Sequence, residues 1–302
     1  MRPRQGIRLV TAALLSAFAW GGPSNVRAQS GSASTADAVG PKATRAKTTK
    51  KPTTADIGKL GVLSRFSTKL VGGEARSKNI RRIARMMDGV VVAPGRSFSV
   101  NHFMGARTEE KKFVLAPDEP ELDPTEIMGG GLSQFSTTLY NALYDAGFPI
   151  FEHTPHRHHV SRYPSGVEVT LGWPGPDLVF KNDSAAPLVI KTSSSPERVV
   201  VKLLGSTPGR KVVRKRPVEL ERKPPPVEHV SDESLRSNQQ VVERQGSPRR
   251  AVRVKRIVEN PGARRRVDEE VVVYSASKRV VRAHPCRLPK GHKDAVKCSN
   301  NK

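Results

Sequence analysis

The stretch Gly129-Gly-Gly-Leu-Ser-Gln-Phe-Ser-Thr-Thr-Leu-Tyr-Asn-Ala-Leu-Tyr144 decides how the centre of this chain folds. Three glycines run directly into a segment whose apolar residues recur near helical spacing: Leu132, Phe135, Leu139, Leu143 and Tyr144. Gly147 follows where a left-handed C-terminal cap would lie. The stretch therefore predicts a flexible turn that leads into an amphipathic helix.

The start of this helix has two interpretations. Glycines let a backbone approach a ligand closely, and the free N–H groups of a first helical turn attract anions or developing oxyanions. A candidate ligand site thus comprises Gly129, Gly130, Gly131 and Gln134, beside the hydroxyl of Ser133. The alternative is that Ser133 is only an N-cap and that the glycines only make a turn.

The N-terminus has the features of a secretory signal. Arg2, Arg4 and Arg8 precede an apolar run over residues 9–20, and Val26-Arg-Ala28 offers small residues for a signal peptidase. The run is shorter than the roughly 20 residues of a membrane span. We expect a signal peptide over residues 1–28, cleaved after Ala28, and export; an uncleaved anchor is the alternative. Residues 29–56 read as a flexible linker.

The net charge of +24 is distributed unevenly over the 302 residues. Residues 57–205 carry 18 basic and 15 acidic side chains, whereas residues 206–302 carry 25 and 11. A strongly basic segment attracts polyanions. Behind a signal peptide, anionic wall polymers and anionic membrane surfaces are better candidate partners than nucleic acid.

The cysteines bear on the redox chemistry of the chain. Cys286 and Cys298 are the two cysteines, and both lie close to the C-terminus. In an exported protein such a pair predicts a disulfide that closes a short loop, here within a C-terminal tail over residues 284–302. A thiol nucleophile is therefore not available in the body of the chain.

Apolar patterning predicts an α+β fold. Two main helices, over residues 78–88 and within 129–144, stand among strand patterns at residues 62–70, 90–92, 97–101, 148–151, 166–171, 177–180, 187–190 and 199–204. These elements define a mixed domain over residues 57–205. Four prolines among basic residues predict a linker over 206–225, and strand signals predict a small basic β-rich module over 226–283. Residues 108–128 are acidic and read as a surface loop.

Four histidines lie within seven residues: His153, His156, His158 and His159. Two of them on one strand face could bind zinc, but no acidic third ligand stands at a metal-like offset, so we predict no metal site and no cofactor. Packing is the ordinary role of such residues. The sharper hypothesis is that His156 acts as a base for Ser133, with Glu152 or Glu168 orienting it, because a serine hydroxyl is a weak nucleophile without a base.

Several motifs resemble VanW-like domains in type and order: Arg65-Phe-Ser-Thr68, Arg76…Asn79-Ile80, Pro94-Gly95…Phe98-Ser99…Asn101, Gly105-Ala-Arg107-Thr108, the central 129–141 stretch, Glu152…His156, Ser161-Arg-Tyr-Pro-Ser-Gly166 and Asp177-Leu…Phe180-Lys-Asn182. VanW is named after an accessory protein encoded with some vancomycin-resistance operons. The resemblance implies an exported envelope protein connected with peptidoglycan, and adds Asn79, Arg162 and Tyr163 to the candidate ligand-binding residues.

The sequence departs from this pattern at its centre. Many members carry Cys where this chain has Ser133, and an Arg is frequent at the position of His153, as Asp is at that of Glu168. These changes leave either a serine nucleophile or a non-catalytic pocket. The C-terminal module resembles a G-five domain through Val241-Val-Glu-Arg-Gln-Gly246, residues 254–258 and the strand near Tyr274; a generic basic β-module explains the same residues.

The leading expectation is thus an exported protein that recognises peptidoglycan or peptides derived from it, in wall maintenance or glycopeptide resistance. An enzyme acting on peptidoglycan peptides through Ser133 and His156 is one alternative. A surface protein that binds polyanions without wall specificity is another.

Overall fold

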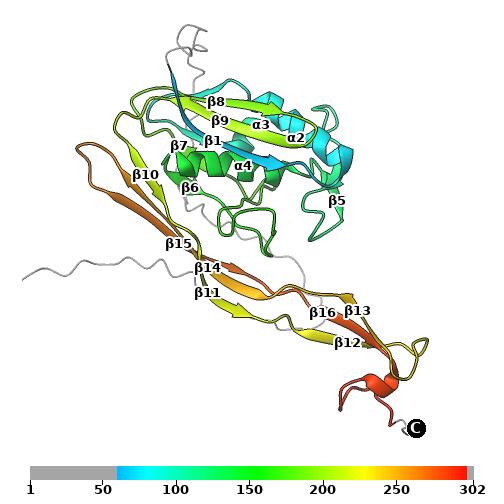
Figure 1. Ribbon diagram of the computed structural model, residues 1–302. Helices are drawn as coiled ribbons and strands as arrows, with labels where there is room; N and C mark the ends of the chain where they lie inside the picture. Colours follow the sequence, from blue (N-terminus) through cyan, green and yellow to red (C-terminus); the bar gives the residue numbers. More distant parts are fainter. Residues whose placement is uncertain (1–59, 298–302) are drawn as a thin grey trace, which may run out of the picture. The chain divides into compact units, whose positions relative to one another are not determined.

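A computed structural model of the chain describes residues 60–297 (Figure 1). All of these residues belong to one compact unit. The predicted signal peptide and the linker over 29–56 lie outside the described residues. Cys298 lies outside them too, so its predicted disulfide with Cys286 remains a prediction. No helix within residues 60–297 is long and apolar enough to cross a membrane.

An antiparallel sheet and two helices organise the α+β domain, residues 60–205. The order of strands in the sheet is β1 (Gly61–Lys69), β9 (Arg198–Gly205), β8 (Leu188–Ser194) and β2 (Val90–Val92). The first strand therefore pairs with the last along nearly its whole length, which closes the domain on itself. Helices α2 (Gly73–Met87) and α4 (Leu132–Asp145) pack against this sheet (Figure 1). The predicted α+β class with two main helices is confirmed.

Helix α2 buries the stripe that its sequence predicted. Ile80, Ile83, Ala84 and Met87 are all within 1% of full burial. The helix begins at Gly73 rather than at Lys78, because Gly72 takes the left-handed conformation at the N-cap. The sequence pattern thus located the buried face but not the first turn.

Smaller strands and a short helix complete the domain: β3 (Ser97–Ser99), α3 (Val100–Met104), β4 (Leu115–Pro117), β5 (Glu126–Met128), β6 (Ile150–Glu152) and β7 (Val179–Lys181). The strand predicted over 97–101 ends early. The hydroxyl of Ser99 accepts the N–H of His102 and so caps α3. Strands β4 and β5 pair with each other as a separate hairpin.

Helix α4 is surrounded by protein, and its polar residues have partners. Every residue from Leu132 to Tyr144 is buried. Ser133, Thr137 and Asn141 form a stripe at i, i+4 and i+8 that faces residues 167–171. Leu171 N–H donates to the Ser133 hydroxyl at 3.0 Å, Val169 N–H to Thr137 at 2.9 Å, and Asn141 donates to the Val167 carbonyl at 2.7 Å. This stripe binds the backbone that the sequence predicted as a strand over 166–171, so that segment needs no neighbouring strand.

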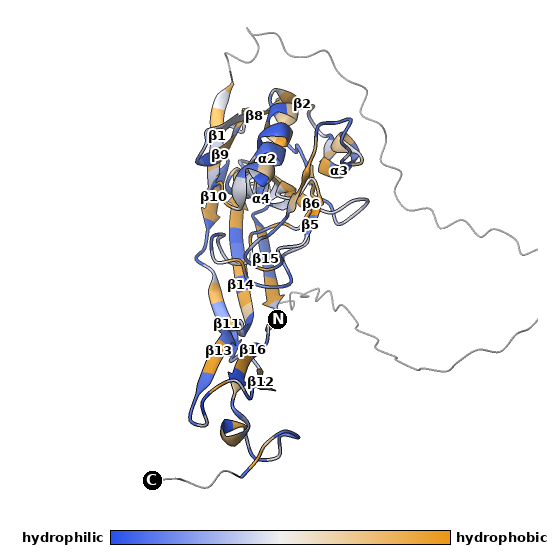
Figure 2. Cartoon of the chain, turned by 90° about the vertical axis from the view of Figure 1, so that its right-hand side faces the viewer, coloured by the Kyte–Doolittle hydropathy of each residue, from blue (hydrophilic) through white to orange (hydrophobic). Residues whose placement is uncertain are grey.

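The C-terminal strands, residues 211–283, form two sheets. The strands are β10 (Lys211–Arg214), β11 (Val218–Lys223), β12 (Val227–Ser231), β13 (Gln240–Arg244), β14 (Arg249–Glu259), β15 (Arg266–Tyr274) and β16 (Arg279–Ala283), followed by the short 3₁₀ helix η1 (Pro285–Arg287). In one sheet β10 and β11 pair with successive parts of β14, which also pairs with β15; in the other β16 lies between β12 and β13. Figure 2 shows hydrophobic and hydrophilic residues following one another along these strands.

Residues 206–225, where a linker was expected, contain two strands instead. Strands β10 and β11 lie in this stretch and pair with β14. Proline and basic residues suggested a linker, but both strands pair with one side of β14 in succession, an arrangement that tolerates prolines between them. The chain therefore passes from the α+β domain into the C-terminal strands through paired backbone.

The C-terminal strands share the core of the α+β domain. Val252, Val254, Val272 and Tyr274 belong to the same buried cluster as the residues of α4. The Tyr274 hydroxyl accepts the N–H of Gly166 at 2.6 Å, and a Cβ at Gly166 would lie 2.4 Å from Val254 Cγ1. Strands β14 and β15 thus contribute to the hydrophobic core of the α+β domain.

Arg256 on β14 caps the C-terminus of helix α4. It is 2% exposed, and its Nη1 donates to the Tyr144 carbonyl at 2.6 Å and its Nη2 to the Phe148 carbonyl at 2.6 Å. Its Nε donates to Asp268 at 2.7 Å, and the guanidinium stacks over the Tyr144 ring. A cation at a helix C-terminus satisfies free carbonyl groups and interacts favourably with the helix dipole.

We predict that Arg256→Met lowers the free energy of unfolding by about 3 kcal/mol or more, because it leaves buried carbonyl groups and Asp268 without their partner. Arg253→Met, on the same strand but 46% exposed, should change it by less than about 0.5 kcal/mol. Urea denaturation compares the two, and equal effects would refute the capping role.

Candidate functional site

The three glycines before α4 are each required by geometry. Gly129 and Gly131 have φ of 80° and 98°, in the region that disfavours other residues. A Cβ at Gly130 would lie 1.9 Å from the carbonyl oxygen of Ala116 on β4. The triple glycine therefore makes the turn and lets β4 pack directly on the start of the helix.

The anion site predicted at the start of α4 is filled by a side chain of the protein. The Asp118 carboxylate accepts the Gly131 N–H at 2.8 Å and the Ser133 N–H at 3.4 Å. Its other oxygen accepts the Ser133 hydroxyl at 2.5 Å. A carboxylate at a helix N-terminus is favourable because it satisfies free N–H groups and complements the helix dipole. The N-cap residue is Gly131 rather than Ser133.

Ser133 and His156 have different partners. The Ser133 hydroxyl lies between Asp118 and the Leu171 N–H, and the residue is fully buried. His156 is 4% exposed; its Nδ1 lies 2.6 Å from the Thr170 hydroxyl and its Nε2 lies 3.2 Å from Glu119. Whichever nitrogen carries the proton, both ring nitrogens are engaged away from Ser133, so the structure does not form the hypothesised pair.

The two candidate orienting carboxylates differ in position. Glu152 is exposed on β6, whereas Glu168 is 1% exposed. Burial raises the pKa of Glu168, which also hydrogen-bonds Tyr274 and interacts with His156. Burial also lowers the pKa of His156, against the attraction of Glu168 and Asp118. Of these two candidates, Glu168 is thus the one that interacts electrostatically with His156.

Asn79 and Gln134 are fully buried and bound by the protein itself. Asn79 Nδ2 donates to the carbonyl groups of Val114 and Gly130 at 2.9 and 3.0 Å. Gln134 Nε2 donates to the Lys69 carbonyl at 2.6 Å, and its oxygen accepts from Arg76. In this arrangement both side chains hold loops in place.

Arg162 and Tyr163 converge on Glu119. Arg162 Nη2 donates to Glu119, and the Tyr163 hydroxyl donates to its Oε1 at 3.0 Å. The Arg162 side chain is 14% exposed, and its guanidinium lies over the Tyr163 ring. The structure therefore brings His156, Arg162 and Tyr163 together around one carboxylate.

Sequence reasoning missed the residues that link the cluster. Arg76 is fully buried; its Nε and Nη2 donate to the Asp118 carbonyl at 2.9 and 2.7 Å, and Nη2 lies 3.6 Å from Glu119. Asp118 and Glu119 belong to the acidic stretch that was predicted as a surface loop. The available sequence signal was that two adjacent acidic residues precede a predicted helix N-terminus. Spacing alone does not distinguish this pattern from an ordinary acidic turn.

The clustered histidines separate in the structure. His158 contacts the Ser275 carbonyl and His159 the Ser165 hydroxyl, while the His153 ring packs at a tilt against Tyr140 with ring centroids 4.7 Å apart. No group of three or more His, Cys, Asp or Glu within residues 60–297 could hold a metal ion.

His153 faces a pocket of about 290 Å³ between α4 and strands β14 and β15. Its Nε2 lies 3.3 Å from Glu270 Oε2 but has no partner of hydrogen-bond geometry among the described residues. Burial lowers the pKa of His153 to about 4 and raises the pKa of Glu270.

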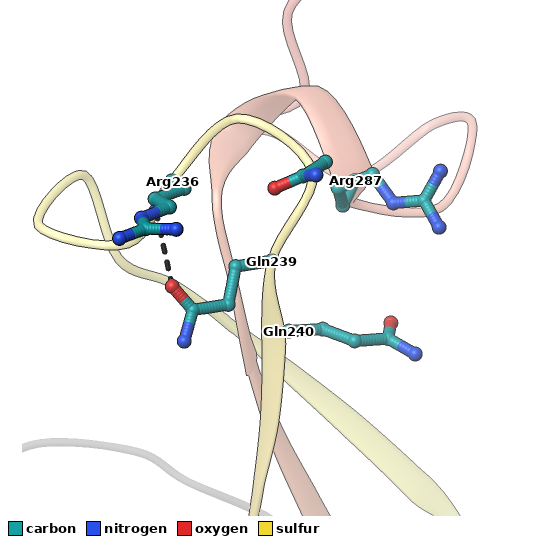
Figure 3. A pocket seen from close by; sticks show the side chains of 5 residues that line it. Arg236, Gln239, Gln240 and Arg287 are labelled. Atoms are coloured by element: carbon teal, nitrogen blue, oxygen red, sulfur yellow. Dashed lines mark hydrogen bonds between the residues drawn. The ribbon is translucent and has the colours of Figure 1, made fainter.

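A second pocket, of about 550 Å³, lies beside β13 and η1 and is lined by Arg236, Asn238, Gln239, Gln240 and Arg287. Figure 3 shows the guanidinium groups of Arg236 and Arg287 pointing away from each other. The polar groups therefore do not converge on one ligand.

The comparisons with known proteins agree with the sequence motifs. Residues 75–204 match the family described as VanW like protein. The uncharacterized protein YoaR of Bacillus subtilis (strain 168) is 32% identical over 154 residues, or 48% of this chain and 51% of that protein. The chain thus spans about half the length of this relative.

A solved structure matches the C-terminal part of the chain. The crystal structure of HP0197-G5 is 20% identical, with a TM-score of 0.15, and the match covers 24% of this chain and 96% of that one.

We predict that Ser133→Ala lowers the free energy of unfolding by about 2 kcal/mol, because the Leu171 N–H and Asp118 then lose a buried partner. Ser136→Ala is the matched control: this hydroxyl is fully buried on the same helix and has no hydrogen-bond partner in the described part of the chain. It should be neutral or stabilising. Urea denaturation measures both, and equal losses would contradict the structural role of Ser133.

The lowered pKa of His153 predicts acid sensitivity. Its folded pKa of about 4 lies below the usual 6.5, so its contribution is complete above pH 6.5 and is lost as the pH falls towards 4. The raised pKa of Glu270 acts in the opposite direction, so the comparison must isolate His153. His153→Gln should flatten the fall in unfolding free energy between pH 6.5 and 4, whereas a change at the exposed His102 should not. Equal slopes in all three proteins would contradict this.

Proposed function

We propose that this chain, whose residues 75–204 match the VanW like protein family, is an exported cell-envelope protein that recognises peptidoglycan or peptides derived from it. Wall maintenance, or a glycopeptide-resistance setting, is the context in which we place it. The C-terminal strands hold the protein on anionic wall polymers, or on an anionic membrane surface, while the domain recognises its ligand.

The observation that carries the proposal is the uncompensated positive charge on the C-terminal strands and tail. Many acidic residues there are already paired; Glu219, for example, lies 2.6 Å from Arg250 and Asp268 lies 2.7 Å from Arg256. Exposed basic side chains for which the described residues record no ion pair remain along the segment: Lys211, Lys215, Arg216, Arg236, Arg244, Arg264, Arg265, Arg287, Lys290, Lys293 and Lys297. Such a surface attracts polyanions at long range.

The α+β domain is close to charge balance, so its contribution must be more local. Its most concentrated set of charged groups is the cluster around Glu119, where Arg162 retains contact with solvent. This location supports recognition of a small anionic group at the start of α4.

The enzymatic alternative, with Ser133 as nucleophile and His156 as base, requires a rearrangement of both side chains. Ser133 would have to break its hydrogen bond to Asp118, and His156 would have to break its contacts with Glu119 and Thr170. A covalent adduct on Ser133 with an acylating probe would favour that alternative.

Charge reversal tests wall binding better than truncation, because removing residues 206–302 would also remove core residues of β14 and β15. We predict that Arg264→Glu with Arg265→Glu weakens binding to wall pellets at least tenfold at low salt. Lys78→Glu with Arg85→Glu, exposed on α2, makes the same change in net charge and should have little effect. Pellet sedimentation measures both, and equal effects would contradict a role for the C-terminal strands.

Salt and polymer choice separate specific from unspecific binding. Binding to purified peptidoglycan without anionic polymers, measured at two salt concentrations, should persist in part at the higher one. Binding that disappears with salt, whichever polymer is offered, would identify the protein as an unspecific polyanion binder.

A further inference from the structure

The tip of the β4–β5 hairpin places two adjacent carboxylates in the charged cluster at the start of α4. Asp118 follows β4 directly, and its carboxylate binds the Gly131 and Ser133 N–H groups while its carbonyl accepts from Arg76. A single residue thus presents a carboxylate and a neighbouring peptide carbonyl to the helix N-terminus and a buried guanidinium. These are the two groups that the end of a peptide would present.

Glu119 binds the other half of the cluster. Its carboxylate, 8% exposed, lies within reach of Arg76, Arg162, His156 and Tyr163. Two guanidinium groups, a phenol and an imidazole around one carboxylate form a built anion site, because donors from helix α2 and from the loop between β6 and β7 converge on it.

The Glu119 carboxylate does not satisfy all the hydrogen-bond donors of this site. Arg162 donates to Glu119 through Nη2, while its Nε is buried without a hydrogen-bond partner among the described residues. A guanidinium can bind a carboxylate through two parallel hydrogen bonds, and a free carboxylate could reach that geometry more easily than one fixed to the hairpin backbone.

The tip of the β4–β5 hairpin is exposed to solvent. Strands β4 and β5 pair with each other in a separate two-stranded sheet. Its base is fixed by Asn79 and Gly130, but residues 121–127 are exposed. The tip is therefore held by the interactions of Asp118 and Glu119 and by the ion pair of Glu121 with Arg162 at 2.5 Å, all of which a ligand carboxylate could replace.

We infer that Asp118 and Glu119 form a displaceable plug in a carboxylate-binding site made by Arg76, Arg162, His156, Tyr163 and the N-terminus of α4. The ligand is a peptide that ends in a free α-carboxylate, and it enters as the hairpin tip withdraws. This inference rests on the proposed function, of which it specifies the ligand chemistry.

The test weakens the plug and leaves the site intact. Glu119→Gln keeps the side-chain shape but removes the charge that binds Arg162. The probes are N-acetyl-L-lysyl-D-alanyl-D-alanine and its C-terminal amide, followed by calorimetry with the full chain. We expect Glu119→Gln to bind the carboxylate peptide at least tenfold more tightly than the unaltered protein, and to bind the amide no better. Glu126→Gln, exposed on β5, is the matched control and should leave binding unchanged.

Adding Arg162→Gln to Glu119→Gln should abolish the gain. Equal affinity for the two peptides, or no binding by folded Glu119→Gln, would overturn the plug. Should Glu119→Gln not fold, the unaltered protein is titrated with millimolar peptide and followed by NMR. Shifts at the amides of residues 118–128 with the carboxylate peptide but not the amide would support the plug, and their absence would overturn it.

Wall-pellet binding, measured in parallel, separates this inference from the proposed function. If the unaltered protein binds wall pellets but Glu119→Gln does not prefer the carboxylate peptide to its amide, the plug alone is overturned. Carboxylate selectivity without pellet binding supports the plug and overturns the proposed attachment to the wall.

Discussion

Helix α4 is enclosed by protein from Leu132 to Tyr144, and the rest of the structure supplies partners for the groups this burial removes from water. Asp118 binds N–H groups at its start, and Arg256 binds carbonyl groups at its end. Along its side, Ser133, Thr137 and Asn141 bind the backbone of residues 167–171. Since buried polar groups without partners are costly, these contacts explain why an acidic hairpin, an irregular segment and a distant strand meet at one helix.

The same constraint shapes the candidate site. The first turn of α4 has the free N–H groups that make helix starts attractive to anions, but a carboxylate of the chain already binds them. Ser133 lies between this carboxylate and the Leu171 N–H, which suits a structural hydroxyl better than a nucleophile. The convergence of Arg76 and Arg162 on Glu119 makes carboxylate exchange the chemistry that this geometry supports best.

The sequence predicted the elements whose periodicity is local. The triple glycine, helix α4, the buried stripe of α2 and the α+β class all follow from spacing and glycine placement. Interactions between distant residues were not predictable. Asp118 and Glu119 read as part of an acidic surface loop because nothing local marks a side chain that turns inward. Residues 206–225 read as a linker because strand pairing with β14 depends on partners that lie 26 (Lys223 and Arg249) to 48 (Lys211 and Glu259) residues away in the chain. Residues 166–171 had a strand pattern, yet their partner is a helix.

Residue-resolved amide hydrogen exchange at Gly131 and Ser133 tests the central claim most directly. Amides in the first turn of a helix ordinarily exchange fast, because they have no partner within the helix. The account predicts slow exchange at both amides in the unaltered protein and fast exchange in Asp118→Ala, with the middle of α4 protected in both. Fast exchange at Gly131 and Ser133 in the unaltered protein would contradict the claim that Asp118 occupies the start of the helix.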